Sequence, residues 1–407
     1  MYQLKKVAIN QENPNYSMAL QRKKQIYQRN HDFRDDFSRD YTRILFSKGY
    51  RRLKHKTQVF FAVDNDHICT RIEHVNLVDA ISNTIAESLG LTTSLVKAIA
   101  IGHDIGHAPF GHGGEKIINQ LAKEAGLSSF YHERNSLFFV DQIELLTNEQ
   151  HQYENLNLTY AVRDGIISHC GEVNQPFIKP RKEAIDLDLF VTPGMYNPYT
   201  WEGCVVKISD KIAYLSRDIE DALVLGILDI NKLQQFVKQL NTIENVSFTH
   251  IDNGVLINYF IADICKHSSI ENGICLSDSA FEVMKQVMQY NYRNIYEIKR
   301  LKVHAAYVEL ILTVLYDVLL NYFESENLFE ALKQDCHLYP LLIHYFIEWI
   351  KEYGKYPFYQ REQTFRNDEV YDLTKISDYK KAILDYISGM TDSFIIKAFN
   401  QVISFTV

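Results

Sequence analysis

Apolar residues recur every three or four positions over most of the chain, which is the spacing of one face of an α-helix. Residues 71–89 show it clearly, because His74, Val78, Ile81 and Leu89 fall on one stripe. Gly90 follows at once, as glycines often do just past a helix end. We therefore predict a helix over 71–89 with His74 facing the interior.

Further helices are expected on the same grounds. Residues 92–94 offer threonine and serine N-caps for a helix that runs through 95–101 to the pair His103-Asp104. A helix over 204–225 would bury one apolar stripe and carry Asp210, Tyr214, Asp218 and Asp221 on its other face. Residues 303–323 and 341–349 read as long amphipathic helices rich in Tyr and Leu.

Strand signals are sparse, and residues 58–63 are the best candidate for a short one. Four of the eight prolines lie between 175 and 199, so that stretch is expected to be a long loop. The predicted fold is all-α, with at most a short β-hairpin.

Composition sets the class of protein that carries these helices. The chain has 407 residues, 46% hydrophobic and 23% charged, which is typical of a soluble globular protein. We see no apolar run approaching the roughly 20 residues of a membrane helix, and no signal peptide at the N-terminus. The six cysteines show no C-x-x-C spacing and are expected to be reduced. A cytoplasmic location without membrane attachment is expected.

Charge is unevenly distributed. Residues 1–56 hold 14 Lys and Arg against 5 Asp and Glu, a balance of +9. Because the net charge of the whole chain is −8, the remaining residues carry −17. The segment 51–56 is the densest basic stretch. It is either a solvated helix face or a phosphate-binding surface for a nucleotide or nucleic acid, with Arg52 as a candidate substrate-binding residue.

The segment 103–115 carries the clearest chemistry. It holds three histidines and two carboxylates, with four glycines and a proline among them. Because buried imidazoles and carboxylates each need a partner, core packing does not explain this mixture, whereas a metal site does. His74 alone would be a satisfied core histidine and Asp210 alone a helix-surface carboxylate. Together with His103-Asp104 they give the order H…HD…D on three helices.

That order resembles the HD-domain phosphohydrolases, and within them the deoxynucleoside triphosphate triphosphohydrolases, the dGTPase-like family. Matching segments fall in order over about 40–230, at 43–60, 70–74, 103–115, 164–169 and 201–222. The resemblance implies an HD-domain helical bundle with an additional C-terminal helical region. It also implies hydrolysis of a dNTP, with dGTP the first choice, to a deoxynucleoside and inorganic triphosphate.

The resemblance assigns roles to individual residues. His74, His103, Asp104 and Asp210 would hold a divalent metal, and Mn²⁺, Fe²⁺, Mg²⁺, Co²⁺, Ni²⁺ and Zn²⁺ remain open. For catalysis it points to His112 and Glu115, which lie three residues apart, to His132 as the other acid candidate, and to His107 as an active-site histidine.

Substrate contacts are implied in the same way. Arg71 and Lys211 match positions that contact the triphosphate, and Tyr214 matches a phosphate-contacting tyrosine. Gln58 and Asp218 match positions that bind the sugar 3′-hydroxyl, and Val59 would crowd a ribose 2′-hydroxyl. The alternative for Arg71, Lys211 and Asp218 is plain helix-surface charge. Where relatives read Phe-Glu-His-Asn-x-Gln-Ser, this chain has Phe-Tyr-His-Glu-Arg-Asn-Ser at 130–136, so the contacts beyond His132 are open.

We predict three regions: a basic N-terminal segment 1–60 that contributes to the active site, a metal-dependent core 61–230, and a helical C-terminal region 231–407 for a lid or oligomerisation. With 26 Tyr and 23 Phe, the chain is expected to form a homo-oligomer (dimer, tetramer or hexamer), unless these aromatics fill a monomeric core. Two other functions remain open: another HD-domain activity, as a nucleotidase or phosphodiesterase, and plain binding of a nucleotide or single-stranded nucleic acid. Either ligand is also a candidate effector.

Overall fold

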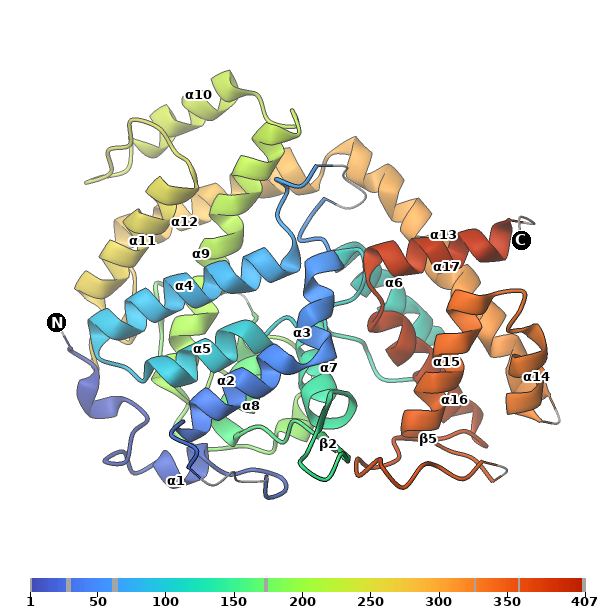
Figure 1. The fold of residues 1–407 in the computed structure, drawn as a ribbon. Coiled ribbons are helices and arrows are strands. Elements are labelled where there is room, and N and C mark those ends of the chain that lie inside the picture. Colours follow the sequence, from blue (N-terminus) through green and yellow to red (C-terminus); the bar gives the residue numbers. More distant parts are fainter. Residues whose placement is uncertain are drawn as a thin grey trace. The chain divides into compact units, whose positions relative to one another are not determined.

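The computed structural model describes residues 2–26, 31–60, 65–171, 175–325, 327–357 and 359–404, and these are mostly helical (Figure 1). The predicted all-α class is confirmed. In the described residues the β structure amounts to three two-stranded pairings, where at most one hairpin was expected. Two of these pairings are antiparallel and one is parallel, and no strand exceeds three residues.

The α-helices of the described chain are α1 (Tyr16–Ala19), α2 (Asp36–Phe46), α3 (Lys48–Arg52), α4 (Arg71–Leu89), α5 (Thr93–Gly102), α6 (Gly111–Glu124), α7 (His132–Phe138), α8 (Tyr160–Ser168), α9 (Trp201–Val224), α10 (Ile230–Leu240), α11 (Asn253–His267), α12 (Asp278–Asn291), α13 (Lys299–Leu320), α14 (Leu328–Asp335), α15 (Pro340–Tyr353), α16 (Ile376–Ser388) and α17 (Asp392–Ile403). Short 3-10 turns are η1 (Lys5–Val7), η2 (Leu53–His55), η4 (Leu187–Leu189) and η6 (Asn321–Glu324), and short π turns are η3 (Phe139–Ile143) and η5 (Tyr292–Tyr296). The strands are β1 (Leu145–Thr147), β2 (Tyr153–Asn155), β3 (Phe177–Ile178), β4 (Ile274–Cys275), β5 (Gly354–Lys355) and β6 (Tyr371–Asp372).

The chain forms two compact units, each built from segments that are discontinuous in sequence. Unit 1 comprises 1–45, 64–104 and 157–302, and unit 2 comprises 46–63, 105–156 and 303–407. The boundary falls between Asp104 and Ile105, inside the histidine-rich segment. The predicted division at residues 60 and 230 stays a prediction.

Unit 1 is organised around α4, α5 and α9, which pack against one another. Helix α4 begins with a capping box, in which Thr70 and Glu73 satisfy each other's backbone, and ends at Gly90 in the left-handed conformation with φ +81°. The apolar stripe and Gly90 had predicted this helix with the bounds observed, whereas the capping box is seen only in the structure. Helix α5 ends at Gly102, so His103 and Asp104 follow its last turn.

Helix α9 is buried on nearly every side, because α4, α5, α8, α11 and α12 all pack against it. The prediction of one apolar and one polar face was therefore incomplete. Asp218 and Asp221 are each only 2% exposed. Because a helix enclosed by neighbours buries its polar residues too, those residues need partners within the unit.

Unit 2 holds α3, α6, α7, all of α13 from Val303 onward, and α14–α17. Helix α15 packs against α14, α16 and α17, and several buried tyrosines place their hydroxyls on backbone carbonyls. Tyr353 donates to Ile143, Tyr379 to Leu319 and Tyr386 to Leu342. Some of the tyrosines of this region therefore fill the core of unit 2.

Two further predictions concern loops: the strand expected at 58–63 and the long loop expected at 175–199. Residues 58–60 form no strand, so that part of the predicted strand 58–63 was wrong, and the rest lies outside the described residues. The turn η2 ends at His55 and Thr57 is a single bridge residue, so the described part of this segment is too short for a paired β-strand. The stretch 175–199 is mostly irregular, as its prolines predicted, with only β3 and η4 inside it.

The expectation about apolar runs also needs correction. In the described chain, the stretch Lys299–Phe323 is long and apolar enough to cross a membrane by length and composition alone, with a mean hydropathy of 1.7 over its most apolar window. A third of that window is buried. The buried positions, from Val308 to Leu319, recur every three or four residues, as in a helix with one face on a protein core. This single helix is weak evidence for a membrane span.

Candidate metal centre

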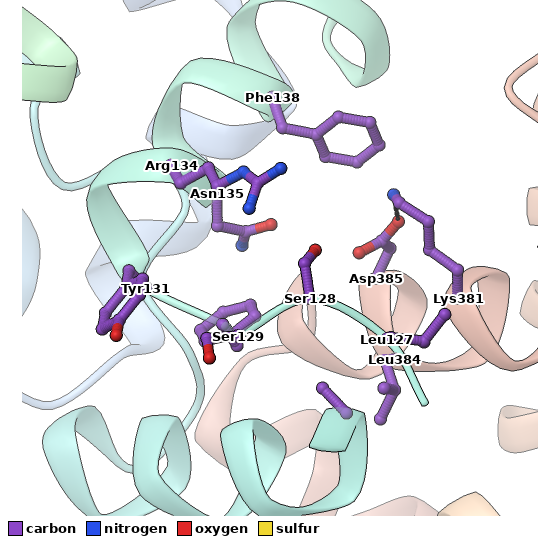
Figure 2. Close-up of a pocket in the computed structure, with 12 residues that line it drawn as sticks. Leu127, Ser128, Ser129, Tyr131, Arg134, Asn135, Phe138, Lys381, Leu384 and Asp385 are labelled. Carbon is purple, nitrogen blue, oxygen red and sulfur yellow. Dashed lines mark hydrogen bonds and ion pairs between the residues drawn. The ribbon is translucent and has the colours of Figure 1, made fainter. Parts of the chain in front are cut away.

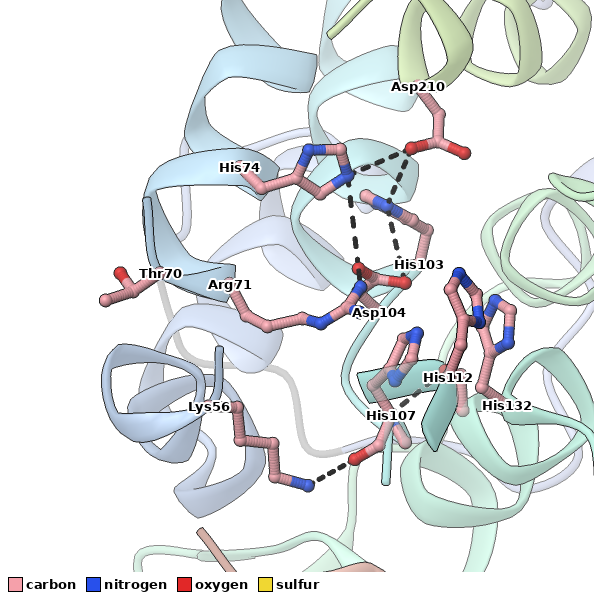
Figure 3. A network of polar contacts seen from close by, with 12 residues as sticks. Lys56, Thr70, Arg71, His74, His103, Asp104, His107, His112, His132 and Asp210 are labelled. Carbon is pink, nitrogen blue, oxygen red and sulfur yellow. Dashed lines mark hydrogen bonds and ion pairs between the residues drawn. The ribbon is translucent and has the colours of Figure 1, made fainter. Parts of the chain in front are cut away.

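The four predicted metal ligands all belong to unit 1, and the structure brings them together. His74 comes from the first turn of α4, His103 and Asp104 from the end of α5, and Asp210 from the middle of α9. Figure 3 shows His74 and His103 turned toward Asp210. Three helices that pack side by side thus present two imidazoles and two carboxylates to one point.

The distances fit donors that share one ion. His74 Nε2 lies 2.9 Å from Asp210 Oδ1, and His103 Nε2 lies 3.7 Å from the same oxygen. His103 Nε2 is 3.6 Å from Asp104 Oδ1, and His74 Nε2 is 4.0 Å from Asp104 Oδ2. Two donors held about 2.1 Å from a common ion are themselves about 3 to 4 Å apart. The cluster has the spread of a metal-binding donor set.

His103 provides an independent indication. Its Nδ1 lies 2.6 Å from the carbonyl oxygen of Ala100, so the proton belongs on Nδ1 and the lone pair on Nε2. That Nε2 is buried, and no hydrogen bond reaches it from any described residue. A buried polar atom without a hydrogen bond is costly unless something else satisfies it. A metal ion would do so, and the bond to Ala100 is the usual way to orient a ligating imidazole.

The charges around the cluster favour the ionised form of Asp210. Burial opposes ionisation of Asp210, but the hydrogen bond from His74 and the nearby imidazoles outweigh it and hold the pKa of Asp210 well below its usual range. Arg71 donates to Asp104 Oδ2 at 2.5 Å, and both side chains are nearly inaccessible. Arg71 was predicted to contact a triphosphate, which stays a prediction; in this structure it holds the orientation of Asp104, a candidate metal ligand.

Unit 2 holds the other predicted catalytic residues, centred on Glu115 of α6. His112 Nδ1 lies 3.2 Å and His132 Nδ1 3.1 Å from Glu115 Oε2, and the backbone N–H of His132 donates to Oε1. Burial opposes ionisation of Glu115, but His132 and the hydrogen bond from His112 outweigh it and keep its pKa well below the usual range. The predicted His112–Glu115 pair is thus one half of a three-residue arrangement in which Glu115 serves two imidazoles.

His107 completes this second cluster by stacking on His132, with ring centroids 4.4 Å apart and planes 22° from parallel. Imidazole lone pairs lie in the ring plane, so two nearly parallel stacked rings do not direct their lone pairs at one ion. This stacking does not favour one ion shared by His107 and His132, although ligand atoms of His107, His112, Glu115 and His132 lie within 4.8 Å of one another. His112 is largely exposed, whereas His107 and His132 are buried.

The backbone before this cluster is held by contacts that the sequence did not reveal. Lys56, almost fully buried, donates to the carbonyls of His107 and Ser388. Asn135 donates to the carbonyl of Gly106 and to Ser388 Oγ, which answers the question left open by its short side chain. A Cβ at Gly106 would lie 2.2 Å from the backbone nitrogen of Ser136, so only glycine fits there.

Comparison with known proteins agrees with this arrangement. Residues 71–215 match the HD domain family, and that range contains all four predicted metal ligands. Over 91% of its length the chain is 31% identical to a deoxyguanosinetriphosphate triphosphohydrolase-like protein of Caldanaerobacter subterraneus subsp. tengcongensis, covering 86% of that protein. The chain belongs to the deoxyguanosinetriphosphate triphosphohydrolase-like family. A relative of the same name from Desulfatibacillum aliphaticivorans is 36% identical over 71% of this chain and 74% of its own length, and one from Clostridium tetani is 31% identical over 91% and 86%.

Within this family member, unit 1 also holds three of the predicted substrate residues, all on α9. Lys211 is buried, Tyr214 is partly exposed, and Asp218 is buried. Plain helix-surface charge therefore does not describe Lys211, Asp218 or Arg71. Asp218 Oδ2 accepts a hydrogen bond from the hydroxyl of Tyr296 at 2.5 Å. Tyr296 lies in η5, outside every segment quoted for the resemblance, and only the tertiary structure reveals it.

Asp218 should make the stability of the protein depend on pH. Burial raises the pKa of its carboxyl to about 7, although the Tyr296 hydrogen bond opposes the shift. The folded chain therefore binds a proton that the unfolded chain has released between about pH 4 and pH 7, and stability falls as pH rises through that window. From pH 5 to pH 8 we expect a loss of about 2 to 3 kcal/mol that the Asp218→Asn variant does not show.

Chemical denaturation of the metal-free protein at several pH values measures this loss. Asp229→Asn, at the exposed N-cap of α10, is the control and should follow the wild-type pH dependence. Parallel curves for wild type and Asp218→Asn would contradict the prediction.

The remaining predicted substrate residues lie in unit 2. Gln58 is buried and Val59 is partly exposed. Arg52 forms a 2.5 Å ion pair with Glu144, whose other oxygen accepts from the backbone of Gly49. Of the basic segment 51–56, then, Arg52 and Lys56 have partners within the unit, while Arg51, Lys54 and His55 are exposed. Only these three fit the picture of a solvated basic face.

A cavity of about 170 Å³ also lies in unit 2, lined by the 127–131 loop, α7 and α16 (Figure 2). Lys381 at its edge is ion-paired with Asp385 and lies 3.9 Å from the ring centroid of Phe138. Small-molecule sites usually measure about 300 to 1,000 Å³, so this cavity is too small for a nucleotide.

Proposed function

We propose that this protein is a metal-dependent deoxynucleoside triphosphate triphosphohydrolase, which converts a dNTP to a deoxynucleoside and inorganic triphosphate. The observation that carries the proposal is the convergence of His74, His103, Asp104 and Asp210 on one point of unit 1. Its family relatives bear the name deoxyguanosinetriphosphate triphosphohydrolase-like protein, which makes dGTP the first substrate to test.

Two nitrogen and two oxygen donors suit Mn²⁺, Fe²⁺, Co²⁺, Ni²⁺ or Zn²⁺, and Mg²⁺ would need additional waters and phosphate oxygens. When bound, such an ion lowers the pKa of a bound water and polarises a phosphoryl oxygen. The chain itself contributes the orientation of the donors. Ala100 fixes the ring of His103, and Arg71 fixes Asp104, so little rearrangement is needed when the ion binds.

Charge on the triphosphate requires cations, and we assign this role to Arg71 and Lys211, with Tyr214 as a neutral donor. Both cations are nearly inaccessible, at 3% and 7% exposure, so their charges are weakly screened by solvent. A buried cation attracts a polyanion more strongly than a surface lysine does, and this favours binding of the triphosphate over a nucleoside.

We assign proton transfer to the leaving 5′-oxygen to the Glu115 cluster. The ionised carboxylate of Glu115 holds Nδ1 of His132 and stabilises positive charge on that ring, while directing Nε2 away from itself. An imidazole held in this way is a suitable general acid. His112 shares the same carboxylate and is the second candidate, and His107 stacks on His132 and keeps its ring in place.

The test is product analysis. Each dNTP is incubated with the protein and Mn²⁺, and the products are separated by anion-exchange chromatography. Inorganic triphosphate and a deoxynucleoside are expected. Phosphate or a monophosphate instead would indicate a nucleotidase or phosphodiesterase, and binding without turnover would indicate a nucleotide-binding protein. The two rival functions are thus outcomes of the same experiment.

Sugar selection gives a further prediction. If Val59 crowds the 2′-position while Gln58 and Asp218 hold the 3′-hydroxyl, dGTP should be preferred over GTP by about 10²-fold in kcat/KM, the usual limit for rejecting an added hydroxyl by an apolar wall. Val59→Ala should reduce the preference mainly by raising activity on GTP. Val224→Ala, at an exposed position of α9, is the control and should leave the ratio unchanged. Equal kcat/KM values for dGTP and GTP in the wild type would refute this account of sugar selection.

A further inference from the structure

His169 is a third imidazole beside the four predicted metal ligands. It ends the segment 164–169, to which the sequence assigned no role. It caps the C-terminus of α8 in unit 1 and is 2% exposed. Its ring meets that of His103 edge-on, with centroids 4.8 Å apart and planes at 70°. It therefore lies directly beside the candidate metal centre.

The tautomer of His169 repeats that of His103. Its Nδ1 lies 2.6 Å from the carbonyl oxygen of Ile166, three residues earlier, as Nδ1 of His103 lies 2.6 Å from Ala100. Each ring thus carries its proton on Nδ1 and its lone pair on Nε2. A backbone carbonyl that fixes one ring nitrogen is the usual orienting contact of a ligating histidine.

A ring nitrogen of His169 lies near the predicted donor atoms. One ligand atom each of His103, Asp104 and His169 lie within 4.8 Å of one another, as do those of His74, His103 and Asp210. His103 belongs to both groups, so the group that contains His169 adjoins the one that contains His74 and Asp210. Because the rings of His169 and His103 are steeply inclined, their in-plane lone pairs can converge, unlike those of the stacked pair His107 and His132.

The competing explanation is a core histidine with a structural role. His169 would then need only its bond to Ile166 and apolar neighbours. It lies beside a carboxylate instead, since one of its ring nitrogens is within 4.8 Å of an oxygen of Asp104. A purely structural position gives no reason for a third imidazole to lie this close to both His103 and Asp104.

We propose that His169 is a fifth protein ligand of the metal centre, so that three imidazoles and two carboxylates bind the ion. This ligand assignment rests on the proposed triphosphohydrolase function only because both involve the same candidate metal centre. Three nitrogen donors favour Fe²⁺, Co²⁺, Ni²⁺ or Zn²⁺ over Mg²⁺ and Ca²⁺. Five protein donors leave fewer positions of the ion for water and phosphate oxygens than the four predicted donors would.

X-ray absorption spectroscopy of the full-length protein loaded with one equivalent of Co²⁺ tests this, because multiple scattering counts the imidazoles bound to the ion. Three are expected in the wild type and two in His169→Gln. Chelator competition should show Co²⁺ binding weakened by about 10- to 100-fold in that variant. His267→Gln is the matched control, since His267 also lies at a helix end in unit 1 with Nδ1 on a backbone carbonyl.

Two imidazoles in the wild-type spectrum would overturn the proposal, and this result needs no variant to fold. An unchanged count in His169→Gln would also overturn it, because a residue that only positions another ligand leaves the count intact. These outcomes are separate from the proposed function: a three-imidazole centre in a protein that releases no triphosphate would support the ligand assignment and refute the triphosphohydrolase assignment.

Discussion

Replacing Asp104 should abolish both metal retention and dNTP hydrolysis. Asp104 supplies an oxygen donor 3.6 Å from His103 Nε2, and its loss removes one of the two charged ligands of the centre. We expect Asp104→Ala and Asp104→Asn to retain little metal and to lower kcat by about 10³-fold or more, because the ion is required to activate water and to polarise the phosphoryl group. Elemental analysis and triphosphate release measure the two effects.

The structure shows that the two variants should differ in stability. Arg71 is buried against Asp104, so Asp104→Ala leaves an unpaired buried cation, which costs about 3 to 5 kcal/mol. Asp104→Asn keeps an oxygen for Arg71 and should lose less stability, so it gives the cleaner test of the metal role. Asp79→Asn is the control, because Asp79 is a carboxylate on α4 that is not among the predicted ligands and lies 4.0 Å from Lys97. Wild-type metal content in Asp104→Asn would exclude Asp104 as a ligand.

Breaking the ion pair between Asp164 and Arg181 should destabilise unit 1 more than any surface substitution. Asp164, on α8, accepts from Arg181 and from the backbone N–H of Tyr199, and its side chain is 1% exposed. Arg181 also donates to the carbonyls of Glu183 and Asn197. The pair therefore anchors both ends of the proline-rich loop to α8.

Asp164→Ala leaves Arg181 charged and largely buried, which should cost about 3 to 5 kcal/mol of unfolding free energy. For a unit of this size the midpoint of thermal unfolding should fall by about 5 to 10 °C. Calorimetry measures the fall, and limited proteolysis should show earlier cleavage within 181–199. Glu282→Ala breaks an exposed ion pair of α12 and should change stability by less than about 0.5 kcal/mol. A midpoint within 1 °C of wild type for Asp164→Ala would be contrary to this account.

The basic N-terminal segment shows how the structure changes the meaning of a charge pattern. A run such as 51–56 has the same sequence signature whether its cations face solvent or partners. Arg52 binds Glu144, and Lys56 is buried on two carbonyls. Glu144 lies 92 residues from Arg52, and the two carbonyls lie 51 and 332 residues from Lys56. The sequence of the segment 51–56 therefore does not predict these partners.

Local signals were sufficient wherever the physics is local. Gly90 and the apolar spacing before it predicted the bounds of α4 correctly, because helix ends and side-chain periodicity are set within a few residues. The same spacing placed His74 inward. The dipeptide His103-Asp104 marked a metal site because imidazole next to carboxylate has no common structural use at a buried helix end.

Tertiary structure alone decided which distant side chains meet and which polar groups are enclosed. The sequence listed His74, His103, Asp104 and Asp210 as candidates, but their separation of 2.9 to 4.0 Å depends on the packing of α4, α5 and α9. It gave no role to His169 and did not reveal the bond from Tyr296 to Asp218, or the sharing of Glu115 by two histidines. These contacts join residues 17 to 78 positions apart, and burial by neighbouring helices, which no local pattern records, sets both their geometry and their ionisation.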